Sequence, residues 1–194
     1  MAGVPFPLLA DDRNLAVGLT MFQNDDIDFY YETLNPKNTS EYKTEEGWKS
    51  FETIQKQIMV KDSTPVDFQY KVSRHGPIMN GLAKGIDGET PIAASWLYTQ
   101  RENRVMHGLF NMNWARNIED FQQALPDIHA PGLNIMYGDA EGNVGWWATA
   151  QLYSMPDSVS TKFILDGASG KNEKQSFLDF SQNPSAVNPP WNYV

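Results

Sequence analysis

The feature that most constrains the fold is a pair of β-like segments between residues 51 and 73. From residue 66 to 72, apolar and polar residues alternate strictly, which is typical of a strand with one buried face. In the preceding segment, 51–61, isoleucine and valine recur at even positions. The polar stretch 62–65 between the two segments ends in proline and favours a turn. The sequence therefore predicts an antiparallel hairpin over residues 51–73.

Further patterns extend this prediction. Apolar runs predict strands at 15–22 and 92–100, and a Gly- and Asn-containing turn at 138–143 predicts a hairpin over 133–150. The consecutive Trp146 and Trp147 in that hairpin should point to opposite faces.

One segment has the signals of a helix. Residues 117–125 begin at Asn117, a good N-cap, and are followed by Pro126, which should end the helix. Residues 35–47 are polar and indicate a loop. We therefore expect an α+β fold, mainly antiparallel hairpins with few helices.

Composition excludes several classes of protein. With 41% hydrophobic and 12% aromatic residues, the 194-residue chain is neither disordered nor a coiled coil, and no apolar run is long enough for a membrane span. A net charge of −9 argues against nucleic acid and anionic membranes as partners. Cysteine is absent, which excludes disulfides and thiolate chemistry.

The titratable residues offer few classical motifs. His75, His107 and His129 lack the spacing of a zinc site, and no G-x-S-x-G motif is present. Three carboxylates, Asp25, Asp26 and Asp28, fall within four residues. Because like charges this close repel, they indicate either a bound hard cation or a solvated acidic turn.

Read together, five segments resemble the penicillin acylase (penicillin amidase) family of N-terminal-nucleophile hydrolases. Each motif is weak alone, but the five occur in the family's order across nearly the whole chain. They are residues 7–20, residues 25–32, Arg74-His75-Gly76-Pro77, residues 137–145, and Asp166-Gly167 together with the Asn-Pro pairs of 183–189.

The resemblance implies a fold and a site. It implies that 1–194 is a single partial domain of the family's αββα catalytic fold, and that the reaction is hydrolysis of an amide in a small N-acylated substrate. The backbone N–H of Met21 maps to one donor of the oxyanion hole. The implied acyl-binding residues are Leu8, Leu9, Leu19, Trp96 and Leu133.

The resemblance also implies a possible metal and a location. The family's calcium ligands map to Asp25, the carbonyl of Ile27, and Asp28, with others supplied from outside this chain; no other cofactor is required. The rest of the α- and β-chains would be partners, and the family is periplasmic or secreted.

Two parts of the family's machinery are not found in the sequence. The chain opens on Met1-Ala2 rather than on a nucleophilic residue. No Gly-Ser, Gly-Thr or Gly-Cys pair, the family's commonest self-cleavage junction, occurs in it. The second oxyanion donor of the family, an asparagine, would lie past Val194. We therefore expect an inactive internal fragment of the β-chain, with strand 15–22 almost at a sheet edge, where it could promote self-association. The alternatives are a non-catalytic binding module with an apolar cleft, and an independent hydrolase that uses His75 with a nearby serine.

Overall fold

The computed structural model describes residues 5–191 and residue 193. The chain forms two compact units. The first unit comprises Met1–Asp26, Leu97–Ser154 and Ser176–Val194, and the second comprises Ile27–Trp96 and Met155–Gln175. Each unit is described by itself below.

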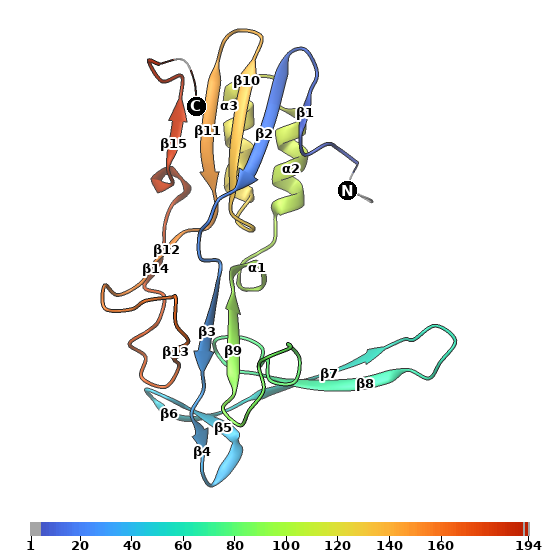
Figure 1. Cartoon of the computed structure of the whole chain (residues 1–194), viewed down its shortest axis with the longest axis vertical. Coiled ribbons are helices and arrows are strands. Elements are labelled where there is room, and N and C mark those ends of the chain that lie inside the picture. The colour runs from blue at the N-terminus through green and yellow to red at the C-terminus, as the bar shows by residue number, and fades with distance from the viewer. Residues whose placement is uncertain (1–4, 192, 194) are drawn as a thin grey trace. The chain divides into compact units, whose positions relative to one another are not determined.

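The first unit is built on an antiparallel sheet with the order β1-β2-β10-β11-β15 (Figure 1). Strand 15–22 and hairpin 133–150 are both confirmed, as β2 and as the β10–β11 pair. The strands are β1 (Ala10–Asp11), β2 (Leu15–Met21), β10 (Leu133–Asp139), β11 (Val144–Thr149) and β15 (Ser185–Val187).

Helices cover one face of this sheet (Figure 1). They are α2 (Val105–Trp114), α3 (Ile118–Ala124) and the 3-10 turn η1 (Leu125–Asp127). The predicted helix is confirmed as α3, where the Asn117 side chain accepts a hydrogen bond from the Asp120 N–H at 2.7 Å. The α-helix ends at Ala124, just before Pro126, and Pro126 lies in the first turn of η1, where proline is tolerated.

Helix α2 was not predicted from the sequence. This helix has no side-chain cap at Arg104, so the start signal that identified α3 is absent. Its apolar residues nevertheless pack on the sheet in the core of the unit. That core contains Leu109 and Met112 of α2, Phe121 of α3, and Ile135 and Trp147 of the sheet.

Smaller elements complete the first unit. The short helix α1 (Leu97–Gln100) lies where the predicted strand 92–100 was expected to continue. Leu97 is fully buried, and its N–H donates to the Asp26 carbonyl at 2.9 Å. The remaining elements are β12 (Tyr153–Ser154), β14 (Ser176–Phe177) and η2 (Phe180–Gln182).

The second unit contains three small sheets. The hairpin predicted over 51–73 is confirmed as β7 (Glu52–Ile58) paired with β8 (Val66–Val72). A second sheet has the order β13-β3-β9, formed by Leu165–Asp166, Ile27–Tyr31 and Ile92–Trp96.

The third sheet corrects a prediction. Residues 35–47, expected to be a loop, form most of the sheet β4 (Leu34–Asn35), β5 (Asn38–Thr44) and β6 (Gly47–Ser50). The polar sequence concealed β5 because only its last residues are inward-facing: Tyr42 and Thr44 are buried while 38–40 are exposed. Across the described residues, no helix is long and apolar enough to cross a membrane.

Candidate functional site

Near the end of β2, the backbone N–H of Met21 points away from the neighbouring strand β10. Phe22 donates its N–H to the carbonyl of Gly132 at 3.0 Å, toward the β10 side. In an antiparallel pair, successive residues bond alternately toward and away from the partner strand. Met21 lies opposite Leu133 in the register, so its N–H points away from β10.

The strand on that side leaves the amide uncovered. Within the described part of the chain, β1 is the neighbour of β2 there, and it pairs only with Ala16 and Val17 near the start of β2. The Met21 residue is also 63% exposed. β2 is therefore almost an edge strand, as predicted, and the N–H of Met21 points to its open side.

Side chains of β10 and β11 make hydrogen bonds that hold the end of β2 in place. The Asn134 amide donates to the Met21 carbonyl at 3.0 Å and to Thr20 Oγ1 at 3.3 Å. Trp146 Nε1 in turn donates to Asn134 Oδ1 at 3.0 Å. The Met21 carbonyl shares its peptide plane with the Phe22 N–H, so these bonds and the Phe22–Gly132 bond together hold the end of β2. These contacts of Asn134 and Trp146 were not predicted from the sequence.

The five residues predicted for acyl binding lie in different environments in the structure. Leu8, Leu19 and Leu133 are partly buried and pack against the same core of the first unit. Leu9 is 62% exposed. Trp96 is the last residue of β9 in the second unit, and it is also exposed. Three of the five residues therefore pack against one hydrophobic core.

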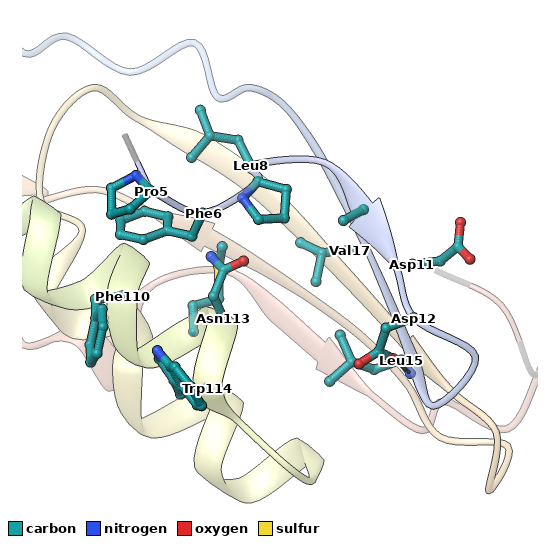
Figure 2. A pocket seen from close by; sticks show the side chains of 13 residues that line it. Pro5, Phe6, Leu8, Asp11, Asp12, Leu15, Val17, Phe110, Asn113 and Trp114 are labelled. Atoms are coloured by element: carbon teal, nitrogen blue, oxygen red, sulfur yellow. Dashed lines mark hydrogen bonds between the residues drawn. The ribbon is translucent and has the colours of Figure 1, made fainter. Parts of the chain in front are cut away.

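An apolar pocket of about 470 Å³ lies beside β2 in the first unit. Figure 2 shows it between the segment 5–12 and helix α2, with Phe110 and Trp114 on the helix side and Leu8 on the opposite side. Phe110 and Trp114 are four positions apart, so they share one helix face. Of the predicted acyl residues only Leu8 lines this pocket, and its aromatic wall was missed because α2 was missed.

The second unit contains a buried network of charges around His75. The His75 ring is 4% exposed and stacks on Tyr30 with centroids 3.9 Å apart. Its Nδ1 lies 2.7 Å from Glu32 Oε1, and its Nε2 lies 3.1 Å from Glu173 Oε1. Arg74 contacts Glu173 at 2.7 Å. Both ring nitrogens thus face carboxylates, which does not match a histidine that activates a serine.

This network predicts a pH dependence. Burial alone would lower the pKa of His75, but the hydrogen bonds to Glu173 and Glu32 and the two negative charges outweigh burial and raise it above 6.5. A raised folded-state pKa means that the folded chain binds the proton more tightly than the unfolded chain. Its contribution to stability is therefore complete below pH 6.5 and is lost as the pH rises through the folded-state value.

We expect the urea midpoint to fall as the pH is raised from 6.5, and to fall less in His75→Gln, which keeps polar atoms but does not titrate. Denaturation curves at a series of pH values measure both. His107→Gln is the control, because His107 is 53% exposed and lies on helix α2 of the first unit. An equal reduction of the pH slope in both variants would contradict the assignment to His75.

The residues predicted for calcium lie in different environments. Asp25 and Ile27 are exposed, whereas Asp28 is 1% exposed. Asp28 forms an ion pair with Lys174, whose Nζ is 2.7 Å from Asp28 Oδ2. Among the residues that the structure describes, no group of three or more His, Asp or Glu residues could hold a metal ion.

Comparison with known proteins identifies the family. The family model described as penicillin amidase matches residues 1–194, so the chain belongs to the penicillin amidase family. The acyl-homoserine lactone acylase QuiP of Pseudomonas aeruginosa is 26% identical over 97% of this chain and 23% of its own length. Penicillin G acylase of Escherichia coli is 24% identical over 91% of this chain and 20% of its own length.

A solved structure agrees with the fold. The thermostable penicillin G acylase from Alcaligenes faecalis matches with a TM-score of 0.85 and 24% identity, over 98% of this chain and 34% of that chain. The α+β, mainly antiparallel fold class is therefore confirmed. The chain spans about a quarter of the length of the curated acylases that it matches.

Proposed function

We propose that residues 1–194 form part of an amide-hydrolysing acylase, the part that binds the acyl group and donates one hydrogen bond to the oxyanion. The observation that carries this proposal is the N–H of Met21, which points away from β10 at an edge that β1 leaves open. Membership of the penicillin amidase family supports the reaction class. The acylases it resembles act on acyl-homoserine lactones and on penicillin G, as their names state, and we propose an N-acylated amide as the substrate.

In this proposal the chain acts on the carbonyl of the substrate. When a nucleophile attacks that carbon, its oxygen becomes negative, and the Met21 N–H donates to it. Collapse of the tetrahedral intermediate breaks the C–N bond. The amine leaves with the proton given up by the attacking group, and the acyl group stays bonded to the attacking group. A donor of this kind typically contributes ~10²–10³ to the rate. Leu8, Leu19 and Leu133, which pack against one hydrophobic core, would contact the acyl chain.

The attacking group is proposed to come from outside these residues. The buried histidine is engaged by two carboxylates, Glu32 and Glu173, and so does not supply a base for a serine. The matched acylases are about four times as long as the aligned region. We therefore expect the 194-residue chain alone not to hydrolyse phenylacetyl, glutaryl or long-chain acyl amides.

The decisive variant removes the donor and leaves Leu8, Leu19 and Leu133 unchanged. In the complete acylase that we propose, Met21→Pro removes the N–H and should lower kcat by ~10²–10³, with a smaller effect on KM because the donor acts mainly in the transition state. Met21→Ala is the matched control, because it removes the side chain and keeps the N–H. Steady-state kinetics on an N-acyl substrate measure both.

Two outcomes would contradict the proposal. One is a Met21→Pro enzyme that is folded, as judged by circular dichroism, and has the kcat of Met21→Ala. The other is turnover by the 194-residue chain alone, which would show that the attacking group lies within it.

The pocket beside α2 favours a second candidate function, a binding module without catalysis. Its aromatic and aliphatic walls suit an acyl chain or an aromatic ring. Calorimetric binding of a long-chain acyl amide to the chain alone, abolished by Phe110→Ala and unaffected by Met21→Pro, would favour this function over the acylase role.

A further inference from the structure

A buried ion pair in the second unit involves a residue predicted to bind calcium. Asp28 of β3 lies directly opposite Ser95 of β9 in the strand register. Lys174 Nζ lies 2.7 Å from Asp28 Oδ2 and donates to Ser95 Oγ at 2.7 Å. Asp28 and Ser95 are 1% and 3% exposed, and the Lys174 side chain is 12% exposed. The ammonium group therefore binds two adjacent strands at a site shielded from water.

The loop that carries Lys174 is held by several contacts. Its neighbour Glu173 contacts His75 and Arg74. One residue earlier, the Asn172 carbonyl accepts a hydrogen bond from the Tyr30 hydroxyl at 3.0 Å. Three consecutive residues of the loop thus contact three different groups of the second unit. These contacts of Asn172 and Glu173 hold the backbone at Lys174 in place, so the position of the ammonium group does not depend on the lysine side chain alone.

A calcium ion does not fit beside this lysine. A buried carboxylate needs a positive partner, and calcium supplies one only with six to eight oxygen ligands at about 2.3–2.6 Å. Here Asp28 Oδ2 already contacts an ammonium, whose charge would repel a divalent ion at the same oxygen. The two other predicted ligands, Asp25 and Ile27, are exposed. The groups around the Asp28 carboxylate therefore fit a lysine ammonium better than a metal ion.

We propose that Lys174 is a built-in cation that replaces a metal ion as the counter-charge of Asp28. The positive charge belongs to the chain itself, so the β3–β9 pair and the 166–175 loop are joined without calcium. The ion pair joins the loop, which carries Lys174, to the sheet, which carries Asp28. Loss of either charge would leave the other charge buried without a partner.

The test compares thermal melts of the 194-residue chain in EGTA and in millimolar calcium. We expect the same Tm in both conditions. Lys174→Met should lower the Tm by about 10 °C, because breaking a buried pair leaves an uncompensated charge. Asp28→Asn combined with Lys174→Met removes both charges and should recover at least half of that loss. Lys171→Met is the matched control, since Lys171 is exposed in the same loop and should leave the Tm nearly unchanged.

Several results would overturn the proposal. A wild-type Tm that falls in EGTA and returns with calcium would show that a metal ion is the counter-charge. A Lys174→Met variant as stable as Lys171→Met would show that the ion pair contributes nothing. If Lys174→Met does not fold, the double variant decides the question. A double variant that folds, as judged by circular dichroism, supports the ion pair. A double variant that is no more stable than Lys174→Met contradicts it.

Discussion

Gly76→Ala is expected to lower the free energy of unfolding by about 3–5 kcal/mol, and thus to leave the second unit barely folded. Gly76 has φ +141°, where an L side chain is strained, at a cost of about 1–3 kcal/mol. A Cβ at this position would also overlap the carbonyl oxygen of Ala94 and lie 3.0 Å from its carbon. That neighbour is backbone of β9, so it cannot rotate away, and overpacking adds about 1–3 kcal/mol. Urea denaturation measures the loss.

Gly81→Ala separates the two causes. Gly81 also has positive φ, at +73°, but nothing lies within 4 Å of a Cβ there. We expect this variant to lose only about 1 kcal/mol, the cost of the backbone conformation. Equal losses in the two variants would show that contact with Ala94 plays no part in the role of Gly76.

Trp147→Ala should lower the free energy of unfolding by about 3–5 kcal/mol, the usual cost of truncating a buried large aromatic residue. Trp147 is 2% exposed and its ring lies 5.9 Å from that of Phe121 on α3. The indole also covers Gly145, where a Cβ would overlap the ring. Removing the side chain therefore opens a cavity between the sheet and the helices, which urea denaturation followed by circular dichroism will detect.

Trp146→Ala is the matched control for chain position and side-chain size. Trp146 lies on the opposite face of β11 and donates one hydrogen bond to Asn134. Loss of that bond and of a partly exposed ring should cost about 1–1.5 kcal/mol. If Trp146→Ala were as destabilising as Trp147→Ala, the assignment of the core to the helix-covered face would be wrong.

The elements that the sequence predicted correctly are those with local signals. The hairpin 51–73 has period-two alternation around a turn, and helix 117–125 begins with a capping asparagine that does cap in the structure. The paired tryptophans were assigned to opposite faces from strand geometry alone. Local patterns of this kind depend on a few neighbouring residues, so they can be recognised without the fold.

The elements that were missed have no such local signal. Helix α2 lacks a side-chain cap, strand β5 is polar over its first half, and the expected strand 92–100 changes to helix α1 at Leu97. Each is decided by what it packs against. Leu109 and Met112 of α2, for example, become core residues only when the sheet lies beneath them.

By itself, the sequence determined the fold class and the family, because strand periodicity and the order of the motifs can be recognised along the chain without the fold. Tertiary structure alone decided which charges meet. His75 pairs with Glu32 and Glu173, and Asp28 pairs with Lys174 rather than with its acidic sequence neighbours. The physical reason is that a buried charge takes its partner from whatever segment the fold brings within about 3 Å, and that distance is unrelated to separation along the sequence.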